Sequence, residues 1–427
     1  MKKLFLNTNH KIRLVFLLLF FVSCSKSEVS NPPPVQPIDN SVNLSHFNKL
    51  YKEIDFNGKK AAMIYIYSDF PNYEPVIAPG EGISCVDDVA RAIIVLSEYI
   101  DVYGTTPDLI DKIKKLTEFV LGMQNENGYF NNFVFSNLSI NTTYSTSIAT
   151  LDWWSLRALW GLETAYPLLQ SDDDLKQRIE QSISKLVSNI KRDLPITNLQ
   201  TEFINGIKYP TWLPQKYASD QSSVLILGLL KNYERTADTS DKLLIDALAQ
   251  GIMVLQKGEG DNYPYGAFMS YKNLWHAWGN DQSYALLKAG IAFNNQIYID
   301  SALKEINGFY PKLIKSGYAE AFSIQASGSN FSEISRIKFP QIAYGIRPMV
   351  SATATAYQYT KNNSQLTLTK NIAAWLTGSN EASLPMYNSE TGVFYDGIVS
   401  ASEINRNSGA ESTIEGLWIL LQLEKLK

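Results

Sequence analysis

The chain has 427 residues and a formal net charge of −4, from 38 Lys and Arg against 42 Asp and Glu. No stretch of the sequence gathers its basic residues into a stripe, so nucleic acid is not an expected partner. Hydrophobic residues make up 45% of the chain and include 24 Tyr and 8 Trp, which is enough for a large core.

The first 23 residues have the pattern of a secretion signal. Basic residues extend to Arg13, and the apolar run 14–22 that follows is too short to span a bilayer. Ser23 precedes Cys24, which predicts a lipoprotein signal peptide over 1–23, cleavage before Cys24 and lipidation of its thiol. An ordinary secretory signal with a chance cysteine is the alternative. Cleavage removes four positive charges and takes the net charge from −4 to about −8.

Residues 24–40 contain three consecutive prolines and almost no apolar cluster, which predicts an extended tether. Helical patterning then dominates, and 41–427 shows no change of composition that would mark a second domain. The predicted helices are 40–56, 84–103, 107–123, 147–169, 172–192, 218–236, 240–256, 280–293, 297–315, 340–360, 364–376 and 409–426.

These helices are of two alternating kinds. Segments such as 89–96, 224–230, 285–292 and 414–421 are apolar on nearly every side, whereas 108–120 and 172–190 are amphipathic. This alternation predicts two concentric rings, with the apolar helices inside. Long loops, in which short hairpins are possible, precede the inner helices, and only short turns follow them, so all the long loops are expected on one face.

Acidic or amide residues recur where the inner helices begin, every sixty to seventy residues. Two of these starts are nearly identical, SDQS at 219–222 and NDQS at 280–283. A period of that length corresponds to one helical hairpin, so the repeat predicts polar side chains around a central cavity. The recurring residues are Asp87, Asp152, Asp220, Asp281, Gln341 and Glu411.

The segments GISCVDDVARA at 82–92 and NRNSGAES at 405–412 resemble a group of bacterial (α/α)6 toroids related to the six-hairpin glycosidases. This resemblance implies an all-α (α/α)6 toroid of six helical hairpins and a carbohydrate-active function. It is weakly specific for the reaction, since the fold hosts hydrolases, lyases, epimerases and binding proteins. It also weakly implies inversion at the sugar.

Glycoside hydrolysis needs two carboxyl groups across the scissile bond, and four acids are candidates. Asp88 and Asp281 are the first choice, followed by Asp87 and Glu411. Each has a structural alternative: a capping box with Ser84 for Asp87, an ion pair with Arg91 for Asp88, a helix-dipole role after an Asn280 cap for Asp281, and a Ser-x-x-Glu capping box for Glu411.

Aromatic rings can stack on sugar rings while polar neighbours bond the hydroxyls, and several such residues lie near the acids or in the long loops. One of the two adjacent tryptophans 153 and 154 must face the core, because neighbours on a helix diverge. The loop aromatics could instead anchor the loops. The substrate-binding candidates are Asp152, Trp153, Trp275, His276, Trp278, Tyr129, Tyr265, Tyr395 and Arg406.

Other chemistry is weakly represented. No two histidines have a metal-ligand spacing, no cofactor fingerprint occurs, and Cys85 has only the distant His276 as a partner. With Cys24 lipidated, Cys85 is the only other thiol, which precludes an internal disulfide. We therefore predict neither metal nor cofactor.

The sequence thus predicts a glycoside hydrolase anchored by lipid in the cell envelope, on the periplasmic or the surface face of an outer membrane. A non-catalytic glycan-binding lipoprotein and a polysaccharide lyase using Tyr or Arg remain alternatives. A sugar epimerase is disfavoured because such toroids use several histidines. The oligomeric state has no sequence indicator.

Overall fold

A computed structural model describes residues 41–427. The predicted signal peptide 1–23, Cys24 and the tether 24–40 lie outside these residues. No helix between residues 41 and 427 is both long enough and apolar enough to cross a bilayer.

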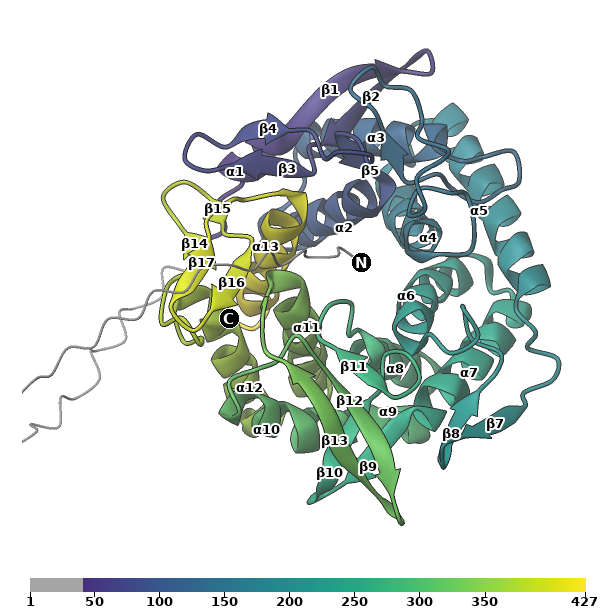
Figure 1. Cartoon of the computed structure of the whole chain (residues 1–427). Coiled ribbons are helices and arrows are strands. Elements are labelled where there is room, and N and C mark those ends of the chain that lie inside the picture. The colour runs from purple at the N-terminus through teal and green to yellow at the C-terminus, as the bar shows by residue number, and fades with distance from the viewer. Residues whose placement is uncertain (1–40) are drawn as a thin grey trace, which may run out of the picture. The chain divides into compact units, whose positions relative to one another are not determined.

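Six helices form a closed inner ring, as the alternation of apolar and amphipathic segments predicts (Figure 1). Each packs on the next in chain order, and the last packs on the first. The inner helices are apolar nearly all round because neighbours cover both sides and an outer helix covers the back. They are α2 (Val86–Tyr103), α4 (Trp153–Ala165), α6 (Ser219–Thr236), α8 (Gln282–Phe293), α11 (Ala343–Thr360) and α13 (Ala410–Glu424).

Five amphipathic segments surround this ring, each packed on the inner helix before it. Four are the helices α3 (Pro107–Gly122), α5 (Asp173–Asp193), α7 (Thr239–Val254) and α12 (Asn363–Ala373). The fifth combines α9 (Gln296–Lys304), the π-helical turn η2 (Glu305–Phe309) and α10 (Tyr310–Lys315), where one helix was predicted over 297–315. The 3-10 turns η1 (Tyr166–Leu168) and η3 (Ala374–Thr377) extend α4 and α12.

The inner and outer helices are joined by short turns that the sequence encodes locally. Helix α6 ends in left-handed Ala237 (φ 55°), and Asp238 then accepts a hydrogen bond from the Ser240 amide to cap α7. Helix α2 ends before Gly104, whose φ of 91° suits glycine, and Thr106 caps α3. Because these reversals take only a few residues, the long loops all lie at the opposite end.

The first predicted helix, 40–56, is wrong over most of its length. Only α1 (Ser45–Leu50) is helical, and Tyr51–Phe56 continues as strand β1, which pairs with β2 (Lys59–Ile64). α1 packs on α13 and the hairpin packs on α3. These tertiary contacts override a local pattern that favours a helix.

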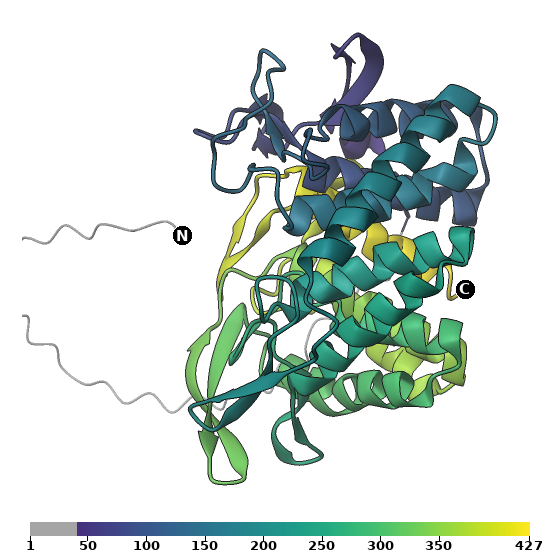
Figure 2. The ribbon, with the colours of Figure 1, turned by 90° about the vertical axis from the view of Figure 1, so that its right-hand side faces the viewer.

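Short antiparallel pairs occupy the end where the inner helices begin, as predicted for the long loops (Figure 2). All the sheets have two strands except one of three, formed by β11, β12 and β13. Beyond β1 and β2, the strands are β3 (Tyr67–Asp69), β4 (Glu74–Val76), β5 (Ser84–Cys85), β6 (Phe133–Val134), β7 (Thr201–Ile204), β8 (Ile207–Pro210), β9 (Gln256–Glu259), β10 (Asn262–Phe268), β11 (Leu274–His276), β12 (Ala321–Ser327), β13 (Asn330–Ile337), β14 (Tyr387–Asn388), β15 (Val393–Phe394), β16 (Gly397–Ser400) and β17 (Glu403–Asn405).

Candidate active site

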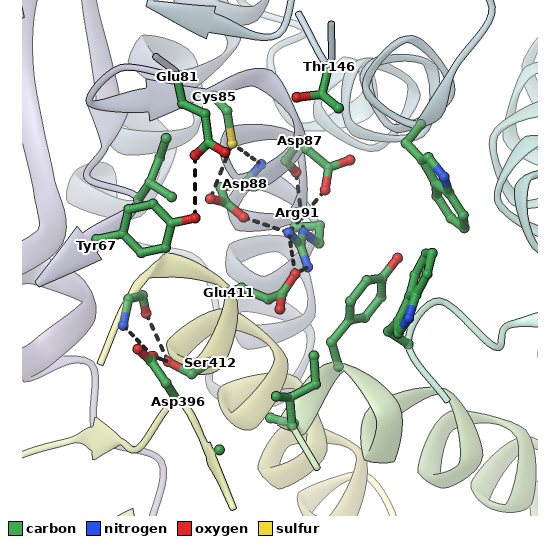
Figure 3. Close-up of a pocket in the computed structure, with 18 of the residues that line it drawn as sticks. Tyr67, Glu81, Cys85, Asp87, Asp88, Arg91, Thr146, Asp396, Glu411 and Ser412 are labelled. Atoms are coloured by element: carbon green, nitrogen blue, oxygen red, sulfur yellow. Dashed lines mark hydrogen bonds and ion pairs between the residues drawn. The ribbon is translucent and has the colours of Figure 1, made fainter. Parts of the chain in front are cut away.

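A cleft of about 580 Å³ lies at the end of the ring that carries the strands. Its walls come from the first turns of α2, α4, α11 and α13 and from the loops before them, so residues far apart in sequence meet there (Figure 3). Asp87, Asp88 and Glu411 are among the residues that line it. The predicted gathering of acids at the inner-helix starts therefore holds for these three.

The two acids of α2 share one guanidinium group. Arg91 Nη2 lies 2.6 Å from Asp88 Oδ1 and 3.0 Å from Asp87 Oδ2. Asp88 also accepts a hydrogen bond from Cys85 Sγ at 3.2 Å. Asp88 and Arg91 are each 3% exposed, whereas Asp87 is 20% exposed. A molecule in the cleft would therefore meet Asp87 more readily than Asp88.

Helix α13 brings two further acids to the same arginine. Arg91 Nη1 lies 3.3 Å from Glu411 Oε2 and 3.0 Å from Glu415 Oε1. Glu411 keeps 41% of its side chain exposed, while Glu415, one turn further on, is fully buried. Four carboxylates thus surround Arg91, and Glu411 is the one that faces the cleft most openly.

The ion pairs continue below the cleft through a second buried arginine. Arg347 Nε lies 2.6 Å from Glu415 Oε2, and its two terminal nitrogens hold both carboxylate oxygens of Asp281. Asp281 is fully buried and is not part of the cleft wall. The geometry therefore gives Asp281 a structural position, in contrast to the catalytic one expected from its aromatic neighbours.

A third arginine supports the wall from α4. Arg157 Nε lies 3.1 Å from Asp87 Oδ1, and its Nη2 donates a short hydrogen bond to the Tyr344 hydroxyl. The guanidinium carbon also lies 5.1 Å from the Tyr344 ring centroid and 5.9 Å from that of Trp153. This arginine fixes both Asp87 and the aromatic rings beside it.

The same burial affects the acids in different directions. It raises the pKa of Asp88, although Arg91 opposes the shift. Glu411 keeps part of its side chain open to the cleft, yet the surrounding protein and then the neighbouring acids raise its pKa to about 7 against the opposing effect of Arg91. Burial also opposes the charge on Glu415, but Arg347 and Arg91 outweigh it and lower its pKa. Glu411 is therefore placed to hold a proton near neutral pH, whereas the two arginines favour the ionised form of Glu415 one turn away.

The helix-capping alternatives are not seen at two of the acids. The Cys85 side chain, rather than that of Ser84, accepts the hydrogen bond from the Asp88 amide in the first turn of α2. The Asp87 amide donates to the Asn132 side chain, so no capping box forms between Ser84 and Asp87. Gly409 is the N-cap of α13 and no side chain caps it, so Glu411 is free of a capping box. Asp281 itself, not Asn280, occupies the N-cap of α8. The ion-pair alternative for Asp88 is present.

Aromatic rings form another part of the cleft wall. Trp153 and Trp278 face each other with centroids 5.9 Å apart, and Tyr344 lies beside them on the wall. The Trp278 ring stacks on His276 at 3.6 Å with an interplanar angle of 10°. His276 Nε2 in turn lies 3.0 Å from Asp220 Oδ2. Asp220 and His276 therefore hold Trp278 from behind and do not line the cleft.

The other predicted substrate-binding residues do not line this cleft. Trp275 is fully buried against Phe322, and the Asp152 side chain caps α4 through the Trp153 amide.

The loop residues have anchoring contacts instead. The Tyr129 hydroxyl donates to Asp193, and Tyr265 lies under the ammonium of Lys312. Tyr395 packs against the core, and Arg406 lies over the Phe70 ring. Loop anchoring, the simpler alternative, describes these side chains.

The structure adds cleft residues that sequence reasoning missed. Glu81 and Tyr67 come from the segment before α2, and the Tyr67 hydroxyl lies 3.4 Å from Glu81 Oε2. Tyr344 follows Gln341, the one recurring start that has no acid. Glu415, which is buried behind the wall, could have been noticed in the sequence as an acid four residues after Glu411 inside an apolar run. No sequence pattern pointed to Glu81.

Within residues 41–427, no three or more His, Cys, Asp or Glu side chains are grouped so that they could hold a metal ion. Three acids of the cleft, Asp87, Asp88 and Glu411, are paired with an arginine instead.

No protein-family model matches the chain, and no curated protein matches its sequence. Solved structures do match its fold. A sugar epimerase from a ruminal bacterium has a TM-score of 0.62 at 12% identity, over 89% of this chain and 95% of that one. Cellobiose 2-epimerase from Bacillus thermoamylovorans gives the same TM-score, identity and coverage.

An α-1,6-mannanase of Salegentibacter matches with a TM-score of 0.53 at 12% identity, over 86% of this chain and 94% of that one. At such identities the similarity concerns the fold alone. Together with the closed inner ring and the outer helices packed on it, it confirms the predicted (α/α)6 toroid fold.

Proposed function

We propose that this protein is a glycoside hydrolase whose catalytic carboxyl groups are Glu411 and Asp87. The observation that carries the proposal is the cluster around Arg91, where a solvent-facing acid with a pKa of about 7 adjoins other carboxylates. Glycosidases need one carboxyl group that is protonated near neutral pH and a second that is ionised. The open aromatic cleft beside the cluster supports a carbohydrate as substrate.

In this mechanism Glu411 is the general acid. It is 41% exposed, so its proton can reach the leaving oxygen of a glycosidic bond in the cleft. Asp87 is the second catalytic carboxyl group and lies at the start of α2, where Arg91 and Arg157 each contact one of its two oxygens. Asp88 is too buried to meet the sugar and acts as a positioning residue that holds Arg91.

The spacing of the two acids favours retention at the sugar. Asp87 Oδ2 and Glu411 Oε2 lie 3.0 and 3.3 Å from the same nitrogen, Arg91 Nη2. These oxygens are therefore closer together than the roughly 6.5 Å at which the carboxyl separations of inverting enzymes begin. We infer that Asp87 is a nucleophile, which departs from the inversion that the family resemblance weakly implies.

One structural neighbour offers a parallel for the acids of α2, though not for Glu411. The mannanase structure is described as an inactive variant in which two adjacent aspartates are replaced by asparagine. Asp87 and Asp88 are also adjacent, at the start of the first inner helix.

Two other enzyme activities are less well supported. Burial raises the pKa of the Tyr67 and Tyr344 hydroxyls, so both stay protonated near neutral pH and neither supplies the ionised base that a lyase needs. Neither histidine in residues 41–427 lines the cleft, which disfavours an epimerase.

A non-catalytic glycan-binding protein is the second candidate. Asp88 and Asp281, the two acids first expected to be catalytic, are both saturated by arginines. A binding protein needs the aromatic wall but no free acid pair. The exposure of Glu411 and its raised pKa favour hydrolysis, because a purely binding wall has no need of a protonated carboxyl group.

We also propose that a lipid on Cys24 anchors the mature protein in the cell envelope, where it would meet glycans. The support is the basic and apolar pattern of 1–23. Cell fractionation of Cys24→Ser is the test. The variant should leave the membrane pellet, and its retention there would count against the anchor.

The hydrolase is tested by incubating the mature protein with plant, algal, host and bacterial glycans and separating the products by chromatography. Saturated reducing sugars are expected. Glu411→Gln should slow their release by about 10²-fold to 10⁴-fold with binding retained, since it removes the acid. Glu126→Gln, the same change at an exposed loop residue outside the cleft, should have no effect.

Unsaturated sugars that absorb in the ultraviolet would instead identify a lyase. Binding without any product, unchanged in Glu411→Gln, would leave the glycan-binding alternative.

A further inference from the structure

The cleft wall carries a strongly one-sided charge. Its acidic residues are Glu81, Asp87, Asp88, Asp396 and Glu411, and its one cation is Arg91. Arg91 is 3% exposed, and both of its terminal nitrogens already face carboxylates. Within residues 41–427, the wall of this cleft therefore offers no free cation to an incoming anion.

Two of these acids lack a basic partner among the described residues. Glu81 has only hydroxyl neighbours, with Tyr67 Oη at 3.4 Å and Tyr144 Oη at 3.5 Å. Asp396 Oδ1 accepts from the Gly409 amide at 2.8 Å and from Ser412 Oγ at 2.7 Å. Their negative charge is offset only by dipoles, so a field of one sign extends over the cleft.

The uncharged part of the wall is aromatic. Trp153, Trp278 and Tyr344 present ring surfaces on which a sugar ring can stack, while carboxylates accept hydrogen bonds from hydroxyl or ammonium groups. A carboxylate or sulfate on the ligand would instead be brought against like charges and lose its hydration.

We infer that the cleft selects glycans that are neutral or carry ammonium groups and rejects uronate-rich or sulfated glycans. This inference rests on the proposed function, because it assumes that a glycan occupies the cleft. Glu81 is the main discriminating residue, since its carboxylate lies on the wall and has no basic partner.

The test compares pairs of glycans that differ only in charge. Each neutral glycan of the panel is converted in part to its carboxylate form by selective oxidation of primary alcohols, which keeps the backbone linkages. Binding of both forms to the mature protein is measured by calorimetry at low salt. The oxidised form should bind at least about 10-fold more weakly, and added salt should narrow the gap because it screens the repulsion.

Substitutions then locate the charge that discriminates. Glu81→Gln should reduce the difference in affinity between the neutral and the oxidised glycan. Glu126→Gln removes an equal charge outside the cleft and should leave this difference unchanged. Equal or tighter binding of the oxidised form would overturn the inference, and so would a gap that neither salt nor Glu81→Gln alters.

The same experiment separates failure of the inference from failure of the hydrolase. Selective binding of neutral glycans without cleavage would support the inference and count against hydrolysis. If no glycan binds in either form, the proposed function fails and the inference falls with it. The salt series on the unaltered protein remains decisive even if Glu81→Gln does not fold.

Discussion

At the scale of single residues, the position of Glu411 contrasts with that of Asp281. Both begin an inner helix and both contact an arginine. Asp281 has both oxygens held and is fully buried, whereas Glu411 shares Arg91 with three other carboxylates and remains 41% exposed. Burial raises the pKa of Glu411, and the cation that it shares with three other carboxylates does not offset this shift, so it can keep a proton near pH 7.

This state of Glu411 predicts a change in stability with pH. Its pKa is about 7 in the folded protein against 4.5 for an ordinary glutamate. Between these values the unfolded chain releases a proton that the folded protein retains, so folding stability falls as pH rises through about 7. Glu411→Gln cannot ionise and should be more stable than the unaltered protein at pH 8 but not at pH 4.

Urea unfolding at the two pH values measures this difference. Because the side chain is partly exposed, the gain is discounted to about 1 kcal/mol. Glu126→Gln serves as the control and should show no gain. A variant that is no more stable at pH 8 would mean that the pKa of Glu411 is not raised in the folded protein, which would also remove its role as the acid near neutral pH.

At the scale of elements, β11 and the residues just after it separate two tryptophans with different roles. Trp275 is fully buried in β11 and stacks on Phe322 with centroids 5.0 Å apart. Trp278, three residues later, is 36% exposed on the cleft wall. The strand therefore contributes one ring to the core and presents the next one to the ligand.

The two tryptophans should respond differently to the same substitution. Trp275→Ala leaves a cavity in the core and should lower the free energy of unfolding by about 3–5 kcal/mol. Trp278→Ala should leave stability nearly unchanged and weaken glycan binding by about 10-fold, as expected for loss of a stacking surface. Urea unfolding and calorimetry on both variants test this, and the opposite pattern would mean that Trp278 is structural.

At the scale of the whole molecule, buried acids connect the two rings. Glu305 in η2 is fully buried, and its carboxylate accepts hydrogen bonds from the Phe268 amide of β10 at 2.8 Å and from Ser283 Oγ of α8 at 2.6 Å. Burial raises its pKa to about 7. The Tyr310 hydroxyl of α10 donates a third hydrogen bond at 3.0 Å. No basic residue is needed to hold Glu305, because dipoles from these three elements satisfy its carboxylate.

Glu305 should therefore contribute to the pH dependence of stability for the whole fold. Its pKa rises from 4.5 to about 7 on folding, so its contribution is complete below pH 4.5 and is lost as pH rises through about 7. A shift of that size corresponds to roughly 3 kcal/mol. Glu305→Gln should remove about this much of the stability decrease between pH 4.5 and pH 8.

The decrease is measured as the difference between urea unfolding free energies at the two pH values. Glu126→Gln again provides the control, and its decrease should equal that of the unaltered protein. An undiminished decrease in Glu305→Gln would show that Glu305 ionises freely in the folded protein. The comparison uses only the change with pH, so a general loss of stability in the variant does not obscure it.

The sequence by itself determined the alternation of helices, the ring to which each belongs and the end of the rings where the long loops lie. These features are local, because apolar periodicity, caps and turn residues act within a few positions. Reliance on local patterns also explains the wrong helix prediction over 51–56. Those residues form a strand because they pair with β2 and pack on α3, and the local pattern does not reveal these contacts.

Only the tertiary structure decided which acid faces the cleft. The repeat places an acidic or amide residue at the start of each inner helix but does not fix the rotation of that helix about its axis. The decisive partners, Arg91, Arg157 and Arg347, come from three different inner helices and meet the acids of others only when the ring closes. Whether a carboxyl group is buried and paired or open and protonated depends on those long-range contacts, which sequence spacing does not encode.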